Sequence, residues 1–314
     1  MPMSRIVSLG HYQPSRVVTN DELAKTVETT DEWIRERVGI ISRRIADKET
    51  VADMAAAAAE KALANSGLTA ADIDLVVVAT CSSVDRSPNV ACRVAAKLGI
   101  QAPAAYDINT ACSGFAYALA TADHALRAGA ARNALVIGAE KLSDITDWTD
   151  RSTCIIFADG AGAAVVTATG EGETPGIGPV VWGSAPERGD AVRIEGWHPY
   201  IKQEGQSVFR WATTAIAPLA RQACERAGVA PEEIAAFVPH QANARIIDGI
   251  AKRLGLSNAV IVKDIVESGN TSAASVPLAL SKLVERREVP SGAPVLLFGF
   301  GGGLTYAGQV VRCP

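Results

Sequence analysis

Apolar residues recur along the chain in two ways, at helical intervals of three and four and in short continuous runs. The helical intervals predict helices, and the short runs rich in Val, Ile and Leu predict strands of a buried sheet. The expected helices span residues 51–66, 89–98, 113–127, 208–227, 242–254 and 273–285. The expected strands span residues 75–79, 135–138, 163–167, 237–238 and 295–298. Helices that alternate with buried strands indicate an α/β fold.

The same pattern returns after 161 positions. Around Gly67 and again around Gly228, a helical stretch ends at a glycine, which tolerates the left-handed conformation common at helix ends. Six residues after each glycine, an isoleucine leads into an apolar strand. The apolar run at 135–138 also has its counterpart at 296–299. Agreement in order at several places predicts an internal duplication.

A segment rich in Gly, Pro and Glu, residues 169–179, marks the expected junction between the two copies. We therefore expect an N-terminal half of residues 1–170 and a C-terminal half of residues 171–314. Two similar halves packed together leave a cleft between them, which is a common location for a functional site.

Composition changes this picture little but excludes several classes of protein. The chain has 314 residues, of which 48% are hydrophobic and 20% charged, enough for a substantial core. The net charge of −4 gives no argument for nucleic acid or a membrane surface, and no apolar run reaches the roughly 18 residues of a membrane span. The N-terminus lacks the pattern of a signal peptide. The six cysteines lack C-x-x-C pairs, so we expect no disulfide framework, no metal site and a cytoplasmic location.

Cys112 is the candidate nucleophile, because it stands where a strand gives way to a helix. Apolar residues recur at helical spacing from Phe115 to Leu126, so a helix begins just after it. The N–H groups and the positive dipole end of that helix are expected to favour the thiolate. On spacing alone, a buried structural cysteine is an equally good interpretation, and it is the expected role of the other five cysteines.

Two residues of the second half are candidate partners. His240 follows the strand at 237–238 and precedes a helix, at the edge of the expected sheet. Asn270 follows Gly269 and precedes a helix of small residues. Taken singly, packing or capping is the ordinary role of the histidine and turn formation that of the asparagine. The 161-residue offset, however, places Asn270 near the equivalent of Cys112, so the two helix starts are expected to meet across the cleft.

Several motifs, taken together, closely resemble those of the β-ketoacyl-acyl carrier protein synthase III family, condensing enzymes of the thiolase superfamily. They are NTACSGF at Cys112, VPHQANARI at His240, SGNTSAASVP at Asn270, FADGAGAAVV ending at Val166, FGGGLTY near the C-terminus and DEWIRERVGI near the N-terminus. The resemblance covers essentially the whole chain. It implies a duplicated, five-layer αβαβα thiolase fold, a Cys-His-Asn triad and a homodimer.

The resemblance also implies a role for each matched residue. Cys112 would carry the acyl group, and the N–H groups of Cys112 and Gly302 would form an oxyanion hole. His240 and Asn270 would hydrogen-bond the malonyl thioester carbonyl and stabilise the enolate formed as carbon dioxide leaves. The coenzyme A contacts would be Trp33, Arg37, Arg151 and Asn243. A basic patch for an acidic carrier protein would consist of Arg210, Arg245, Lys252 and Arg253. Without the resemblance, a solvated helical face is an equally good interpretation of that patch.

Ser87 departs from the family pattern. It stands where some members have a bulky phenylalanine that reaches the acyl pocket of the partner subunit. Because serine leaves room there, we predict that branched or longer acyl primers are accepted as well as acetyl groups. The loop before Asn270 has ESGN where some members have HGN, which is not expected to affect the triad.

The reaction implied by the resemblance is a ping-pong condensation. An acyl-CoA primer would load Cys112, and malonyl-acyl carrier protein would then be decarboxylated and attack it, giving a 3-oxoacyl-acyl carrier protein for fatty acid or polyketide synthesis. No metal or organic cofactor is expected, because the substrate thioester is itself the electron sink.

Three alternatives to this reaction are open. A papain-like peptidase has the same order of Cys, His and Asn, but the C-G-S-C-W/Y motif is missing around Cys112. A non-condensing relative would move the acyl group from coenzyme A through Cys112 to an alcohol or amine. A non-catalytic scaffold would form no acyl-enzyme at all.

Overall fold

The computed structural model describes residues 3–170, 172–196 and 200–314. Among these residues, the strands form two five-stranded sheets and two short two-stranded ones. The first large sheet has the order β1-β7-β6-β4-β5, with β1 Ser4–Tyr12, β4 Leu75–Ala79, β5 Ala104–Ile108, β6 Asn133–Lys141 and β7 Asp159–Ala168. The second has the order β12-β11-β13-β14-β8, with β8 Val181–Ser184, β11 Ala236–Pro239, β12 Val260–Ile261, β13 Pro294–Gly301 and β14 Thr305–Arg312. The short sheets pair β2 (Arg16–Thr19) with β3 (Ser42–Ile45) and β9 (Val192–Arg193) with β10 (Lys202–Gln203).

The two large sheets repeat one topology, which confirms the predicted duplication. Strands β8, β14, β13, β11 and β12 of the second sheet correspond in order to β1, β7, β6, β4 and β5 of the first. In each sheet the last three strands of this order are parallel, and the first two pair in antiparallel fashion. Strands β4 and β11 begin at Leu75 and Ala236, 161 positions apart, and β6 and β13 begin with the same offset. The boundary between 170 and 171 stays a prediction, and residue 171 lies outside the described residues.

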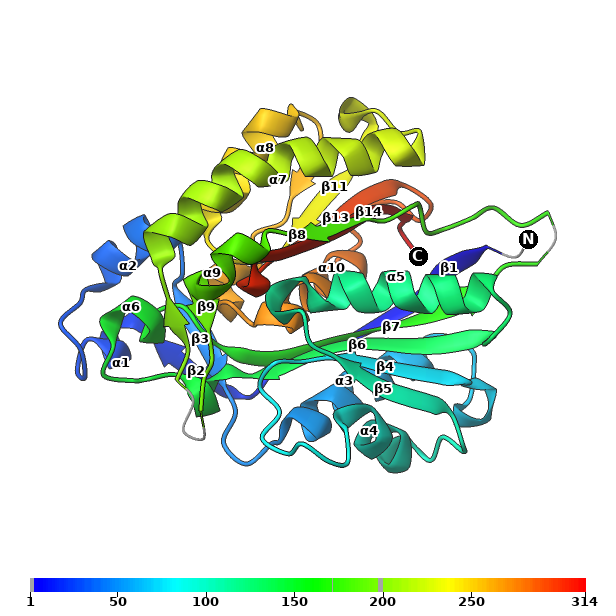
Figure 1. Ribbon diagram of the computed structural model, residues 1–314, viewed down its shortest axis with the longest axis horizontal. Helices are drawn as coiled ribbons and strands as arrows, with labels where there is room; N and C mark the ends of the chain where they lie inside the picture. Colours follow the sequence, from blue (N-terminus) through cyan, green and yellow to red (C-terminus); the bar gives the residue numbers. More distant parts are fainter. Residues whose placement is uncertain (1–2, 171, 197–199) are drawn as a thin grey trace.

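Within the described ranges, six longer helices complete five layers, as expected for an αβαβα fold. They are α3 Val51–Ala64, α4 Val90–Leu98, α5 Gly114–Arg127, α7 Gly205–Ala227, α8 Ala244–Leu254 and α10 Ser275–Glu285. In Figure 1, α7 and α8 cover the upper face of the second sheet, α5 and α10 lie between the sheets, and α3 and α4 cover the lower face of the first sheet. Phe115 and Leu119 of α5 and Leu280 of α10 are fully buried in the central layer. Each such side chain contributes about 1.5–3 kcal/mol of burial free energy.

Smaller helices and turns refine the predicted boundaries. Helix α3 begins with a capping box, since the Thr50 hydroxyl accepts the Asp53 N–H and the Asp53 carboxylate accepts the Thr50 N–H. Helices α5 and α10 each start one or two residues later than predicted, because a 3₁₀ turn precedes each of them. These turns open with Ala111 and Ser272, equivalent residues with left-handed φ angles of 45° and 48°. The remaining helices are α1 Asn20–Leu23, α2 Asp31–Val38, α6 Arg151–Cys154 and α9 Ile265–Ser268. In the described part of the chain, no helix combines the length and the apolar character needed to cross a bilayer.

Candidate active site

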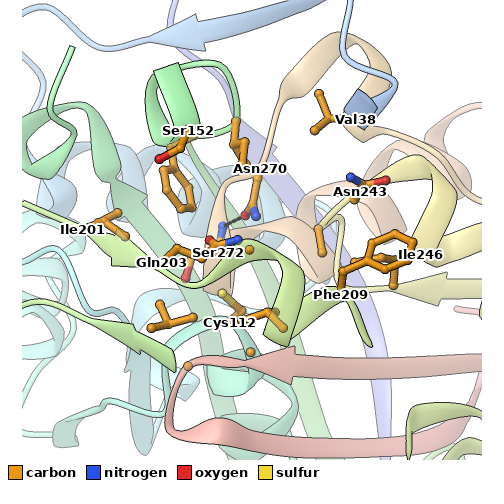
Figure 2. A pocket seen from close by; sticks show the side chains of 18 of the residues that line it. Val38, Cys112, Ser152, Ile201, Gln203, Phe209, Asn243, Ile246, Asn270 and Ser272 are labelled. Carbon is orange, nitrogen blue, oxygen red and sulfur yellow. Dashed lines mark hydrogen bonds between the residues drawn. The ribbon is translucent and has the colours of Figure 1, made fainter. Parts of the chain in front are cut away.

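A cavity of about 700 Å³ collects residues from both halves of the chain. Figure 2 shows this cavity with Cys112 on one side and Asn270, Ser272 and Asn243 around it. Its lining includes the predicted residues Cys112, His240, Asn270, Gly302, Trp33, Arg37, Arg151, Asn243, Arg210 and Arg245. Of the described residues predicted for the site, Ser87, Lys252 and Arg253 do not line it. Folding therefore brings the three triad residues to one place, although Cys112 and Asn270 are 158 positions apart in the chain.

Cys112 lies in the turn Ala111–Ser113, between the end of β5 and the start of α5. Its sulfur hydrogen-bonds the Ser272 hydroxyl and the backbone N–H groups of Gly302 and Cys112 itself. Burial, with a smaller contribution from the buried carboxylate of Glu140, nevertheless raises the pKa of the thiol to about 11, although those hydrogen bonds lower it. The N–H groups at the helix start favour the thiolate as expected, but desolvation outweighs them and the net pKa is raised.

The loop after β13 approaches Cys112 so closely that only glycine fits. A Cβ atom on Gly301 would lie 2.6 Å from the Cys112 Cβ and 2.8 Å from its sulfur. A Cβ atom on Gly302 would have more room, with the Ala111 Cβ nearest at 3.1 Å and Val192 next at 3.6 Å. The close approach at Gly301 is what brings the Gly302 N–H to the sulfur.

His240 follows β11 directly and is only 2% exposed. Its N–H donates to the Phe298 carbonyl at 2.8 Å, its Nδ1 lies 2.8 Å from the Ser275 hydroxyl, and its ring meets Phe300 edge-on. Burial lowers the pKa of the imidazole to about 3. The histidine is therefore neutral at physiological pH and acts as a hydrogen-bonding group with no charge of its own.

Asn270 is held by its backbone and its side chain. It forms a parallel bridge with Phe157, in which its N–H donates to the Ile156 carbonyl and its carbonyl accepts the Ala158 N–H. Its Oδ1 accepts the Ser272 N–H at 2.8 Å, the dashed line in Figure 2. With Oδ1 taken by that bond, the Nδ2 hydrogens are left for a ligand in the cavity.

The predicted coenzyme A residues surround the mouth of the same cavity. The guanidinium of Arg151 lies 5.0 Å from the centre of the Trp33 ring, and Trp33 itself is 37% exposed. Asn243 caps α8 by accepting the Arg245 N–H, and its Nδ2 donates to the Arg37 carbonyl at 3.1 Å. An exposed aromatic ring beside a guanidinium can bind a ligand that has both a flat ring and a negative charge.

The predicted basic patch is divided by the structure. Arg210 and Arg245 are exposed and line the cavity, and the Arg245 guanidinium lies over the Phe209 ring at 5.5 Å. Lys252 and Arg253 are exposed in the last turn of α8, about 10 Å farther along that helix at 1.5 Å per residue. Arg245, Lys252 and Arg253 therefore follow α8 away from the mouth, whereas Arg210 lies on α7.

Ser87 is exposed on the loop between β4 and α4. Ser87 does not line the cavity of its own subunit. The expectation for Ser87 concerns the acyl pocket of a partner subunit, so it stays a prediction.

Sequence reasoning missed three residues that stand behind Cys112. Cys81, expected to be structural, lines the cavity, and so does Ser272. Glu140 at the end of β6 is fully buried beside Cys81. A signal for Cys81 was available in the repeat, because residue 79 is the equivalent of His240 and Cys81 follows it at the same sheet edge. Among the described residues, no cluster of three or more His, Cys, Asp or Glu could hold a metal ion.

Comparison with known proteins identifies the family. The family model described as 3-oxoacyl-(acyl-carrier-protein) synthase III matches residues 106–186, and its C-terminal model matches residues 224–313. The chain is 64% identical to β-ketoacyl-(acyl-carrier-protein) synthase III 4 of Streptomyces coelicolor, over 99% of both chains. The chain belongs to the 3-oxoacyl-(acyl-carrier-protein) synthase III family.

Further proteins share this similarity over nearly their full length. The synthase III of Mycobacteroides abscessus is 48% identical over 98% of this chain and 94% of its own. The crystal structure of the priming β-ketosynthase from the R1128 polyketide pathway superimposes with a TM-score of 0.97 at 42% identity, covering 99% of this chain and 96% of that one. The synthase III of Aquifex aeolicus superimposes with a TM-score of 0.93 at 41% identity, covering 98% and 99%.

Proposed function

We propose that this enzyme catalyses the decarboxylative Claisen condensation of an acyl-CoA primer with malonyl-acyl carrier protein, which starts fatty acid or polyketide synthesis. The observation that carries the proposal is the meeting of Cys112, His240 and Asn270 in one cavity, with the Gly302 N–H on the cysteine sulfur. A nucleophile with an adjacent N–H donor suits acyl transfer, and two neutral donors suit an enolate. The reaction needs no metal or organic cofactor, because the thioester carbonyl accepts the electrons.

The first half-reaction belongs to Cys112. Its sulfur attacks the acyl-CoA carbonyl, and coenzyme A leaves with the electron pair of the broken carbon–sulfur bond. The N–H groups of Cys112 and Gly302, which donate to the sulfur, would then donate to the oxyanion. One such donor is worth roughly 10²–10³ in rate in other enzymes.

The second half-reaction belongs to His240 and Asn270. The Ser275 hydroxyl accepts the Gln241 N–H at 3.2 Å, so its own hydrogen is free to point at the histidine Nδ1. That tautomer leaves a hydrogen on Nε2, and the Asn270 Nδ2 hydrogens provide a second donor. Both would stabilise the negative oxygen of the enolate as carbon dioxide leaves the malonyl group.

Substrate entry is assigned to the cavity mouth. Trp33, Arg37 and Arg151 would hold the nucleotide end of coenzyme A, and Asn243 would lie along its pantetheine arm. Arg210 and Arg245, continued along α8 by Lys252 and Arg253, would dock the acidic carrier protein. Salt is then expected to weaken carrier-protein binding more than acyl-CoA loading.

The enzyme is proposed to be a cytoplasmic homodimer. Strand β5 is the edge of its sheet and leads directly to Cys112, so pairing of two β5 edges would bring two active sites close together. The loop that carries Ser87 also carries Val84, which is 77% exposed, and a partner subunit would cover it. In that arrangement Ser87 would reach the partner's acyl pocket and leave space for longer or branched primers.

Separate measurement of the two half-reactions tests the proposal. We expect Cys112→Ala to form no acyl-enzyme, whereas His240→Ala is acylated normally but releases no carbon dioxide from malonyl-acyl carrier protein. Cys92→Ala, which removes an exposed thiol of α4, is the matched control and should behave as the native enzyme. Loss of both half-reactions to a similar extent in His240→Ala would contradict this division of labour.

A further inference from the structure

Glu140 is a buried carboxylate that the reaction described above does not use. It is 0% exposed and accepts hydrogen bonds from the Thr80 hydroxyl at 3.0 Å, from the Ser82 hydroxyl and from the backbone N–H groups of Cys81 and Ser82. Every one of these partners donates a hydrogen, which favours the ionised carboxylate and offsets part of the rise in the Glu140 pKa that burial causes. The Glu140 carboxylate therefore lies directly behind Cys81, which lines the cavity.

A continuous line of polar contacts joins this carboxylate to the nucleophile. The Cys81 thiol donates to Glu140 Oε1 at 3.3 Å. On its other side, the Cys81 sulfur lies 3.8 Å from the Ser272 hydroxyl, and either atom can be the donor. The Ser272 hydroxyl in turn hydrogen-bonds the Cys112 thiol, and Figure 2 shows the two side chains next to each other. The left-handed backbone of Ser272 and its N–H bond to Asn270 hold this hydroxyl in place.

The nucleophile needs a proton acceptor. With a thiol pKa of about 11, only about one Cys112 in ten thousand is a thiolate at pH 7. His240 lines the same cavity, but burial lowers its pKa to about 3, and Ser275 occupies its Nδ1. A group with such a low affinity for protons is a poor general base.

We propose that Ser272, Cys81 and Glu140 form a relay that takes the proton from Cys112 during acylation and returns it to the departing coenzyme A. This inference rests on the proposed acylation of Cys112. Ser272 touches the reacting sulfur, whereas Cys81 and Glu140 act through it.

The transfer balances over one acylation. As the Cys112 sulfur forms its bond to the acyl carbon, its proton passes to the Ser272 oxygen, the serine proton passes to the Cys81 sulfur, and the Cys81 proton passes to the Glu140 carboxylate. When the carbon–sulfur bond to coenzyme A breaks, the Glu140 proton returns to Cys81 and the Cys81 proton to Ser272. Ser272 then passes its proton to the coenzyme A thiolate, because the Cys112 sulfur is now acylated. Glu140 ends the step ionised, Cys81 and Ser272 keep their hydrogens, and no external acid or base is consumed.

The relay depends on few ionisable groups. Burial is the main cause that raises the pKa of Glu140 and of Cys81. As neighbouring negative charges, Glu140 raises the pKa of Cys112, and Cys112 raises the pKa of Cys81. The titratable groups along the line are thus Cys112, Cys81 and Glu140, with neutral His240 in the same cavity.

Two substitutions of Cys81 test the relay directly. The single-turnover rate of Cys112 acylation by acyl-CoA is measured by intact-protein mass spectrometry between pH 6 and 9, for the native enzyme and both variants. Cys81→Ala removes the middle of the relay and should slow acylation about tenfold or more, within the range expected of a lost general base. Cys81→Ser keeps a hydrogen that can be passed on and should recover a large part of the rate. Cys92→Ala, outside the cavity, should acylate as the native enzyme does.

The pH dependence separates the relay from a merely structural role. The native rate should level off above the pKa of Glu140, whereas Cys81→Ala and Glu140→Gln should keep rising toward the pKa of the Cys112 thiol.

Three results would overturn the relay. They are native-like acylation by Cys81→Ala, equal slowing in Cys81→Ala and Cys81→Ser, and slowing without any change in the pH profile. If Glu140→Gln does not fold, the Cys81 pair still decides the question. Failure of the native enzyme to load any acyl-CoA would instead overturn the proposed function, and the relay with it.

Discussion

Substitution of Gly301 by alanine isolates the geometry of the nucleophile from its chemistry. The new methyl group would stand 2.6 Å from the Cys112 Cβ, about 1 Å closer than the normal 3.5–4.0 Å between carbon atoms. The Cys112 Cβ is one bond from a backbone held between β5 and α5, so it cannot swing away, and either the loop or the sulfur must move. Overpacking of this kind costs about 1–3 kcal/mol of folding stability. A displacement of about 1 Å at a reacting atom costs roughly 100-fold in rate.

Single-turnover acylation by acyl-CoA, followed by intact-protein mass spectrometry, measures this effect. Gly302→Ala is the matched control, because the same change one residue later meets its nearest atom, the Ala111 Cβ, at 3.1 Å and needs only a small adjustment. We expect Gly301→Ala to load about 100-fold more slowly and Gly302→Ala to stay within about tenfold of the native rate. Acylation by Gly301→Ala within twofold of native, or a larger loss in Gly302→Ala, would refute the reasoning.

Three further predictions concern binding, primer choice and acid stability. Trp33→Ala removes the ring beside Arg151 and should raise the KM for acyl-CoA about tenfold with little change in kcat, as measured by steady-state loading. Ser87→Phe should shift a chain-length profile toward acetyl-CoA, and a profile already confined to acetyl-CoA in the native enzyme would contradict the prediction. Because burial holds the His240 pKa near 3 against 6.5 in the unfolded chain, stability should fall as pH drops from 6.5 toward 3, by up to about 1.4 kcal/mol per pH unit. In urea unfolding at pH 7 and pH 5, His240→Gln should lose less stability than the native enzyme.

The sequence predicted the central parts of the fold well because they are the most apolar. Strand β4 was found with both ends correct, since all five of its residues are fully buried and β-branched, Leu or Ala. Strand β7 was predicted from Ala163 but begins at Asp159, because its first residues include glycines. A Cβ on Gly162 would overlap the backbone of Leu278, so the glycine is there to let α10 approach the sheet. Local propensity cannot reveal such a contact between distant segments.

The candidate site shows a similar limit. The 161-residue repeat was enough to expect Cys112 and Asn270 to meet across a cleft, and the structure places them, with His240, in one cavity. The protonation state of Cys112 could not be predicted, because it depends on how much solvent the opposite half excludes. The place of Cys81 was missed for the same reason, since only tertiary structure sets it between Ser272 and Glu140.

A pulse and chase on the native enzyme tests the central claim most directly. The protein is incubated with a panel of acyl-CoAs, and its intact mass and the labelled peptide are recorded before and after addition of malonyl-acyl carrier protein. The account predicts an added acyl mass on Cys112 that disappears in the chase as 3-oxoacyl-acyl carrier protein forms. A label that persists through the chase would indicate a non-condensing acyltransferase, and no label with any acyl-CoA would contradict the account as a whole.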